Sequence, residues 1–427
     1  MKRILIVSVF FPPCERIGGK RPYNLANYLA NNGWDVTVLT LKEFYTPPLG
    51  VDKIVDDRIT VIRTDAFLPY VSLTNKSLVS RTNTSQKVDV SYKVKPSYLS
   101  VIKSSLITSI KKYIRLGLSK LDHIDEYSGW HNSAIKEMIK RNLDFDIVLA
   151  TIPPYSASYL GVKLADYYKC KFVLDYRDPW CDLKDYEHMQ TKYGRKKAIN
   201  HKKIEDMCLK RANLITSVSP GISSKLVDRS SSKVLTLPQG YTGEANLSRI
   251  DKNEELYVLY AGSLAYGRDL SVILKSIHIL SVEKNLDICL IYCGEHSDIA
   301  LQQARSVGAE SVLKTRGYLR EAEAIELSTK AFCNLVIISE GYEYAYPGKL
   351  FDLITSGRPV CVYCKNENEA GLLVNNYSLG LSVINEDAAA VSSSLYKLLD
   401  YENEVSKNLT ELKIENILSQ LLKEFDQ

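Results

Sequence analysis

Short apolar runs recur through the chain, and a turn and a helix-like stretch follow most of them. Runs such as 4–10 and 334–339 are almost continuously hydrophobic, which is typical of strands buried on both faces of a parallel sheet. Because such strands alternate with helices, the pattern predicts an α/β fold. The predicted strands are residues 4–10, 35–40, 58–63, 146–150, 171–175, 213–218, 233–238, 257–261, 287–293, 312–316, 334–339, 360–363 and 379–383.

The length of 427 residues exceeds that of one typical domain and suits two. A polar, glycine-containing stretch, 239–254, interrupts the strand–helix rhythm and is the predicted linker. We therefore predict two Rossmann-like domains that face a cleft, at 1–238 and 255–401. A last charged helix within 402–427 is expected to cross back to the first domain.

Charge and cysteine content narrow the class of protein. The net charge of +5 is small for this length, and no basic module with interleaved aromatic residues is present, so nucleic acid is not an expected partner. Nine cysteines, an odd number, are scattered through apolar segments, as expected for reduced thiols in the cytosol. The pair Cys361 and Cys364 lies along a predicted strand without a second pair, so we expect no metal site there. The apolar start of the chain suits a core strand better than a signal peptide, and no run is long enough to span a bilayer.

The stretch 346–359 combines a strand exit, a helix start and a cation. Pro347 suits the first helical turn, and Gly357 ends the helix before the next strand. A strand that leads into a helix offers free N–H groups to an anion. Lys349 adds positive charge there, and Asp352 could accept hydrogen bonds from a ribose. The alternative is an ordinary strand–turn–helix unit with surface charges.

Further glycine-containing loops follow predicted strands at Gly18-Gly19, Gly262-Ser263 and Gly317-Tyr318-Leu319. Small residues there would let a phosphate approach the backbone, or they could merely allow a tight turn. Arg268 lies on the second of these loops and, with Lys349, would suit a diphosphate. Neither a dinucleotide fingerprint nor a P-loop is present, which disfavours phosphoryl transfer from a triphosphate.

Arg177 and Asp178 follow the predicted strand 171–175, at the strand end where open α/β sheets bind ligands. The two residues could form an ion pair that joins loops, or they could contact an acceptor or take part in catalysis. Both interpretations remain open at this point.

Residues 96–121 are rich in lysine and arginine and carry no acid, while their apolar residues fall near helical spacing. A basic amphipathic helix of this kind can lie on an anionic membrane surface. The alternative is a helix that covers the domain core with its lysines in solvent. We expect membrane contact, mainly because of the family that the whole sequence resembles.

The sequence resembles the GT-B glycosyltransferases of family 4, the retaining bacterial type that assembles lipopolysaccharide, capsule and exopolysaccharide. The resemblance runs nearly from end to end. It is carried by Ile4-Leu-Ile-Val7, Phe11-Pro-Pro13, Gly18-Gly19, Arg21, Ala26-Asn-Tyr-Leu29, Gly33-Trp-Asp-Val-Thr-Val-Leu39, Pro153-Pro154, Asp175-Tyr-Arg-Asp-Pro-Trp180, Thr216-Ser-Val-Ser-Pro-Gly221, Leu237-Pro-Gln-Gly-Tyr241, Tyr260-Ala-Gly-Ser263, Gly317-Tyr318, Pro347-Gly-Lys-Leu-Phe-Asp352 and Ser356-Gly-Arg-Pro-Val360.

The resemblance implies a nucleotide-diphosphate sugar on the second domain and an acceptor on the first. Asp352 would bind the ribose, where the family usually has glutamate, and Arg268 and Lys349 would act on the diphosphate. Asp178 is the candidate for contacting the acceptor. No metal or other cofactor is expected, because GT-B enzymes generally need none. The remaining implied donor residues are Gly18, Gly19, Gly262, Ser263, Gly317, Tyr318, Leu319, Tyr346, Gly348 and Leu350.

Besides Asp352, the chain departs from the family pattern at three places. Loop 151–156 lacks the histidine found in many relatives, so we name no general base. Ile273 occupies the position of a frequent second cation, which Lys349 would replace. Tyr344 occupies the position of the first of two paired acids, so Glu340 or Glu343 would stand in.

The expected function is therefore transfer of a hexose-type sugar to a lipid-linked or other saccharide acceptor, in the cytoplasm at the inner face of the membrane. Two alternatives remain: a nucleotide-sugar 2-epimerase of the same fold, and a non-catalytic relative that binds a partner in polysaccharide assembly. The histidine-free loop argues against the first, and intact Arg268, Lys349 and Asp352 argue against the second.

Overall fold

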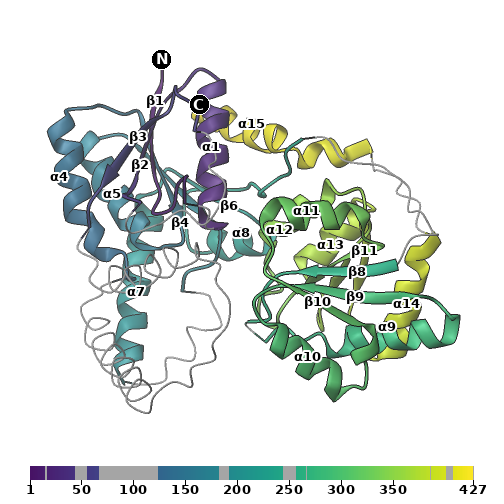
Figure 1. The fold of residues 1–427 in the computed structure, drawn as a ribbon. Helices are drawn as coiled ribbons and strands as arrows, with labels where there is room; N and C mark the ends of the chain where they lie inside the picture. The colour runs from purple at the N-terminus through teal and green to yellow at the C-terminus, as the bar shows by residue number, and fades with distance from the viewer. Residues whose placement is uncertain are drawn as a thin grey trace, which may run out of the picture. The chain divides into compact units, whose positions relative to one another are not determined.

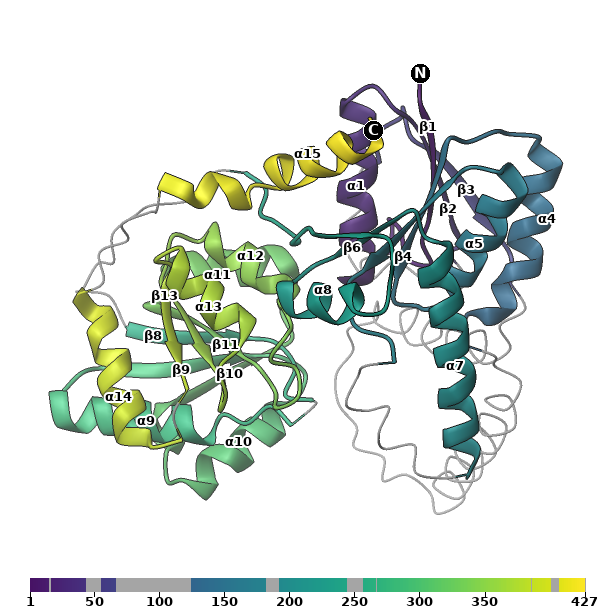
Figure 2. The same cartoon turned by 180° about the vertical axis from the view of Figure 1, so that it is seen from behind.

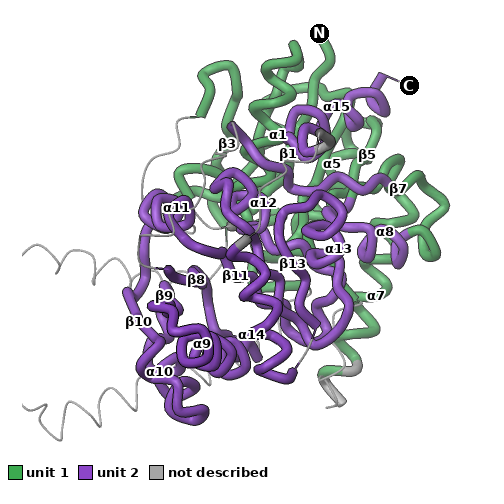
Figure 3. Tube along the Cα trace, turned by 90° about the vertical axis from the view of Figure 1, so that its right-hand side faces the viewer, with its two compact units in different colours: residues 1–216, 227–234 green, residues 217–226, 235–427 purple. Residues whose placement is uncertain are grey.

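The fold is given by a computed structural model of the chain (Figure 1). It divides into two compact units, one of residues 1–216 with 227–234 and one of residues 217–226 with 235–427 (Figure 3). The domain bounds expected from the sequence, and the crossing of the last helix, stay predictions. The basic stretch 96–121 lies outside the described residues, which are 1–14, 17–43, 55–66, 124–181, 192–243, 256–265, 267–384, 386–400 and 407–426.

The described strands of the first unit belong to a seven-stranded sheet in the order β3-β2-β1-β4-β5-β6-β7. Every neighbouring pair with a described register runs parallel. The central strands are almost fully buried, which explains their continuous hydrophobic sequence. The strands are β1 (Arg3–Val7), β2 (Asp35–Leu41), β3 (Thr60–Thr64), β4 (Ile147–Ile152), β5 (Lys171–Tyr176), β6 (Leu214–Ser217) and β7 (Lys233–Thr236).

Helices cover both faces of this first sheet. Figures 1 and 2 show α1 (Lys20–Asn31) on one face, and α4 (His131–Arg141), α5 (Ser156–Tyr168) and α7 (Lys192–Arg211) on the other. The buried side of α1 includes Arg21, Leu25 and Leu29, spaced by one helical turn each. A charged side chain therefore occupies a core position of α1, and it needs a partner there.

The second unit holds a six-stranded sheet in the order β10-β9-β8-β11-β12-β13, again parallel in each described register. Figures 1 and 2 show α9, α10 and α14 on one face and α11, α12 and α13 on the other. The strands are β8 (Leu256–Ala261), β9 (Ile288–Cys293), β10 (Leu313–Gly317), β11 (Cys333–Ile337), β12 (Val360–Tyr363) and β13 (Gly380–Val383). The helices are α8 (Pro220–Val227), α9 (Ser271–Lys284), α10 (Ser297–Ser306), α11 (Glu321–Lys330), α12 (Gly348–Ile354), α13 (Glu369–Asn376), α14 (Ala388–Lys397) and α15 (Ile414–Phe425), with short 3-10 turns at Ile17–Gly19, Ser128–Trp130, Glu310–Val312, Leu398–Asp400 and Lys407–Leu412.

Both sheets have the same winding. In each, the chain starts at an inner strand, adds two strands on one side, then returns and adds the rest on the other side. The winding reverses between β1 and β4 in the first sheet and between β8 and β11 in the second. In open α/β sheets, ligands bind outside the carboxyl ends of the strands at such a reversal. The predicted α/β class is confirmed, and the topology indicates one candidate ligand-binding edge in each unit.

Candidate functional site

The site of the second unit centres on Lys349, the second residue of α12, at the reversal between β8 and β11. Its Nζ donates a hydrogen bond to the carbonyl oxygen of Ala261, at the end of β8, over 3.1 Å. The same Nζ lies 4.2 Å from the ring centroid of Tyr260, within the range of a cation–π interaction. The helix α12 thus places a cation directly on the carboxyl end of β8.

A second cation lies on the turn after β8. The Nη1 of Arg268 donates to the carbonyl of Ser263 over 3.4 Å, and the hydroxyl of Tyr260 donates to the same carbonyl over 2.9 Å. Arg268 and Lys349 are both half-buried. Ser263 and Arg268 therefore lie close to Lys349 of α12.

The crowding of these cations changes the protonation of Lys349. Burial lowers the pKa of its amine, and the charge of Arg268 lowers it further, to about 7. A lysine ordinarily titrates near pH ~10.4, so this amine is close to half-protonated at neutral pH. An anion that binds here would favour the protonated form and would relieve the repulsion between the two cations.

A cavity of about 140 Å³ opens next to Lys349, lined by residues of α11, α12, β8 and β11. Asp352, on the same helix turn as Lys349, lines it, so the predicted ribose-binding acid and the predicted diphosphate-binding cation border the same space. The lining is mostly apolar. Besides Lys349 and Asp352, it comprises Leu259, Ala261, Ala324, Ile325, Ser328, Asn334, Leu335 and Leu353.

The structure explains why glycine occupies two of the predicted positions. A Cβ on Gly262 would lie 3.0 Å from the Nζ of Lys349, so the absence of a side chain leaves room for the amine. Gly317 has a φ of +67° at the end of β10, a conformation that L side chains rarely adopt. Gly262 thus makes room for the amine of Lys349, and Gly317 allows the backbone turn after β10.

Other predicted donor residues lie in varied surroundings. Leu350 is fully buried in the core, and its backbone N–H already donates to the Pro347 carbonyl over 2.9 Å. Tyr346 packs edge-on against Phe351, at 6.0 Å between ring centroids. Gly348 begins α12. The side chains of Leu350 and Tyr346 thus contribute to the packing beneath the site.

The loops beside the site carry the remaining candidates. Tyr318 is 69% exposed after β10, whereas Leu319 packs against the hydrophobic core. Glu340 is exposed after β11. The carboxylate of Glu343 accepts hydrogen bonds from the Gly341 N–H over 3.0 Å and from the Asn366 amide over 2.9 Å. The side chain of Glu343 therefore shapes its own loop.

The segment 217–226 also reaches this loop, although it precedes the second sheet by many residues. The hydroxyl of Ser219 donates to the Tyr344 carbonyl over 2.6 Å. A Cβ on Gly221 would lie 2.8 Å from the Cβ of Tyr344, so α8 approaches the loop closely at a glycine. No local pattern in the sequence indicates this contact.

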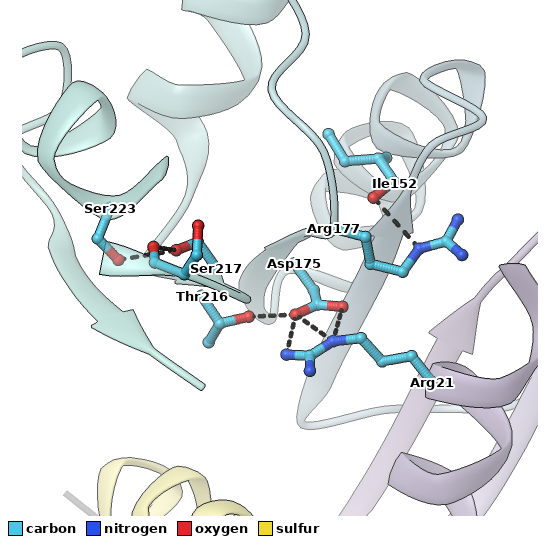
Figure 4. A network of polar contacts seen from close by, with 8 residues as sticks. Arg21, Ile152, Asp175, Arg177, Thr216, Ser217 and Ser223 are labelled. Atoms are coloured by element: carbon cyan, nitrogen blue, oxygen red, sulfur yellow. Dashed lines mark hydrogen bonds and ion pairs between the residues drawn. The ribbon is translucent and has the colours of Figure 1, made fainter. Parts of the chain in front are cut away.

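The first unit carries a buried ion pair at the end of β5 (Figure 4). The guanidinium of Arg21 donates from Nη2 to Oδ1 of Asp175 over 2.7 Å and from Nε to Oδ2 over 2.8 Å. The hydroxyl of Thr216 donates to the same Oδ1 over 2.6 Å. Burial alone would raise the pKa of the Asp175 carboxyl, but Arg21 and Thr216 outweigh it and hold that pKa below its usual range.

The sequence pattern alone does not predict this network, although its members lie within the motifs that carry the resemblance. Two opposite charges occur where apolar residues are expected: Arg21 on the apolar side of α1, and Asp175 within the buried run of β5. Charges of opposite sign at buried periodic positions are the signal that could have paired them.

The predicted residues Gly18 and Asp178 lie beside Arg177 at the same sheet edge. A Cβ on Gly18 would lie 2.9 Å from Nη1 of Arg177, so the guanidinium occupies the space that this glycine leaves. A Cβ on Gly19 would lie 3.1 Å from the Cys14 carbonyl. Asp178 is exposed; the surrounding protein still raises its pKa, against the opposing charge of Arg177.

Comparison with known proteins establishes the fold and nothing finer. No protein-family model and no curated sequence matches this chain. Among solved structures, it is similar to sucrose-phosphate synthase from Thermosynechococcus elongatus, with a TM-score of 0.64, 14% identity, and coverage of 100% of this chain and 99% of the other. WaaG, a glycosyltransferase involved in lipopolysaccharide biosynthesis, gives 0.60 and 10%, covering 99% of each chain. HepE from Anabaena, solved with UDP-glucose, gives 0.57 and 11%, covering 100% of each. The chain has the GT-B fold, as the sequence predicts.

The Arg21–Asp175 pair makes a direct prediction about stability. Because Arg21→Met leaves a buried carboxylate without its counter-charge, we expect the variant to lose about 3–5 kcal/mol of unfolding free energy. Arg211→Met is the matched control, since Arg211 and Asp166 form a partly exposed pair at 2.6 Å, whose loss should cost about 1 kcal/mol or less. Urea unfolding followed by tryptophan fluorescence measures both, because Trp34, Trp130 and Trp180 all lie in the first unit. Equal, small losses would contradict this assignment.

The lowered pKa of Lys349 makes a second prediction. Only the unprotonated amine reacts with acetic anhydride, so its acetylation rate should rise through about pH 7 and level off about one pH unit higher. A free lysine amide in the same tube should reach its midpoint near pH ~10.4. Peptide mass spectrometry measures the rate at Lys349. Arg268→Gln should move the midpoint upward, because one source of repulsion is removed; a midpoint like that of the free amide in the unchanged protein would contradict the geometry.

Proposed function

We propose that the chain is a retaining glycosyltransferase that moves a hexose-type sugar from a nucleotide-diphosphate sugar to a lipid-linked saccharide during synthesis of cell-surface polysaccharide. The observation that carries the proposal is the pair of cations, Arg268 and Lys349, on the carboxyl end of β8 with Asp352 on the same helix turn. The fold supports it, since WaaG is a lipopolysaccharide glycosyltransferase and HepE was solved with UDP-glucose.

The proposed chemistry depends on charge. When the bond between the anomeric carbon and the β-phosphate oxygen breaks, both electrons leave with that oxygen and the sugar becomes cation-like. Lys349 and Arg268 would then bind the departing diphosphate more tightly than the intact donor, which lowers the barrier. The acceptor hydroxyl forms the new bond on the same face and gives its proton to the departing phosphate oxygen. No side-chain base is then required, which fits loop 151–156 without histidine.

The donor is assigned to the second unit, with Asp352 on the ribose and Lys349 on the diphosphate. The loop 317–319 would lie beside the base. We expect no metal in the reaction, because two cations can already neutralise the diphosphate. Asp178 of the first unit is assigned to the acceptor.

We also propose that the protein works in the cytoplasm at the inner face of the membrane, where a lipid-linked acceptor would be reached. Within the described ranges, no helix combines the length and the hydrophobicity of a membrane span. The proposed membrane contact is the basic stretch 96–121, whose lysines would approach anionic headgroups.

Nucleotide binding tests the donor site. Thermal shift against UDP, GDP, ADP and TDP should single out one base, and a ligand at about a hundred times its dissociation constant adds about 2.7 kcal/mol of stability. Lys349→Gln should weaken that nucleotide at least about tenfold, because a charge-assisted hydrogen bond is lost. Lys275→Gln, at an exposed lysine of α9, should leave the affinity unchanged.

The same preparations separate transfer from the alternatives. Incubation with the preferred nucleotide sugar and a saccharide acceptor should release the nucleoside diphosphate and retain the anomeric configuration, as NMR of the product can show. Rapid epimerisation of the donor without acceptor would identify an epimerase instead. Unchanged affinity and transfer in Lys349→Gln would place the donor elsewhere.

A further inference from the structure

Arg177 occupies the reversal point of the first sheet. It comes directly after β5, its Nε donates to the carbonyl of Ile152 at the end of β4 over 3.4 Å, and its Nη1 lies against Gly18, in the turn between β1 and α1. The guanidinium is therefore positioned by the carboxyl ends of two neighbouring strands, β4 and β5, and by the turn after a third, β1. This is the edge where open α/β sheets bind ligands.

The buried acid beside Arg177 does not neutralise it. Asp175 receives three charge-assisted hydrogen bonds from Arg21 and one bond from Thr216, so its charge is already matched. Figure 4 shows Arg21 turned toward this carboxylate and the terminal nitrogens of Arg177 turned away from it. The Arg21–Asp175 pair thus frees Arg177 for another anion.

The guanidinium of Arg177 keeps unused hydrogen-bonding capacity. An arginine has five N–H donors and stays charged in proteins. Within the described part of the chain, Arg177 donates through its side chain only to Ile152, over a long bond. Burial lowers its pKa, while the charges of Asp178 and Asp175 oppose that effect and Arg21 adds to it. A half-buried guanidinium with unused N–H donors is suited to a phosphate that accepts two hydrogen bonds from it.

Gly18 fixes where the guanidinium lies. A Cβ at this position would approach Nη1 of Arg177 to 2.9 Å and a ring carbon of Phe10 to 2.7 Å. The glycine therefore lets the guanidinium lie against the turn before α1, rather than letting a ligand touch the backbone at that point. A methyl group there would displace the arginine and leave its charge intact, which provides a second way to test the site.

We propose that Arg177, seated on Gly18, forms a phosphate-binding site in the first unit and that it binds a phosphate group of the acceptor. The proposal rests on the proposed function for the acceptor only, since the donor cations Arg268 and Lys349 belong to the second unit. A lipid-linked saccharide carries phosphate next to its sugar, so one arginine could both bind and orient it. An ion pair that merely joins loops would instead direct Arg177 to a carboxylate.

Inorganic phosphate is the first probe, with chloride at matched ionic strength as its control. Trp180 lies close to Arg177 in sequence and stacks on Tyr155 at 4.9 Å, and all tryptophans lie in the first unit, so tryptophan fluorescence should report phosphate bound there. We expect saturable quenching whose dissociation constant rises at least about tenfold in Arg177→Gln, and less in Arg177→Lys, because a bidentate charge-assisted contact is lost. Lys349→Gln should not change it.

Gly18→Ala keeps Arg177 but should weaken phosphate binding several-fold, which covers the case that Arg177→Gln fails to fold. Thermal unfolding of each variant confirms its folded state. Equal phosphate affinity in the unchanged protein, Arg177→Gln and Gly18→Ala would overturn the proposal, and so would a loss seen only in Lys349→Gln.

The source of the phosphate is tested with UDP and with farnesyl diphosphate, a short lipid diphosphate. Arg177→Gln should weaken farnesyl diphosphate at least about tenfold and leave UDP unchanged. A comparable loss for UDP with none for farnesyl diphosphate would assign the site to the donor and overturn the proposal. If the protein binds no nucleotide and transfers no sugar, the proposed function fails, yet the response of phosphate binding to Arg177→Gln still decides this site.

Discussion

One hydrogen bond, from Nζ of Lys349 to the carbonyl of Ala261, joins segments 88 residues apart and defines the site of the second unit. It fastens α12 to the carboxyl end of β8 and brings a cation onto the ring of Tyr260. Gly262 leaves the room that the amine needs, and Asp352 borders the cavity beside it. The Ala261 carbonyl and the Tyr260 ring hold the amine of Lys349, and a bound anion would neutralise its positive charge.

The two units share one topology but carry different charges at the corresponding sheet edge. Each parallel sheet reverses its winding beside its first strand, and each places arginine or lysine at that edge. In the second unit two cations crowd together, which favours a ligand of high charge such as a diphosphate. In the first unit the guanidinium of Arg177 lies outside the buried pair of Arg21 with Asp175. In the proposed function, Lys349 and Arg268 assist cleavage of the sugar–phosphate bond, and Arg177 anchors the acceptor.

The sequence predicts the strands well because a strand buried on both faces must be hydrophobic along its length. It also predicts that Gly262, Ser263, Arg268 and Lys349 meet, since parallel strands present their carboxyl ends at one edge. It does not predict that the carboxylate of Glu343 accepts hydrogen bonds from Gly341 and Asn366. Local pattern shows that a residue comes after a strand, but not which side chains fill the space around it. Long-range pairing accounts for the rest: Gly18 could have served a turn or a ligand, and its actual neighbour is Arg177, more than a third of the chain away.

The central claim is that Lys349 and Arg268 receive the diphosphate of a nucleotide sugar. The most direct measurement is a crystal structure with the nucleoside diphosphate that thermal shift selects. We predict that Nζ of Lys349 leaves the Ala261 carbonyl for a phosphate oxygen, that Arg268 contacts the same diphosphate, and that Asp352 accepts from the ribose. A nucleotide bound elsewhere, with Lys349 still on Ala261, would contradict the claim.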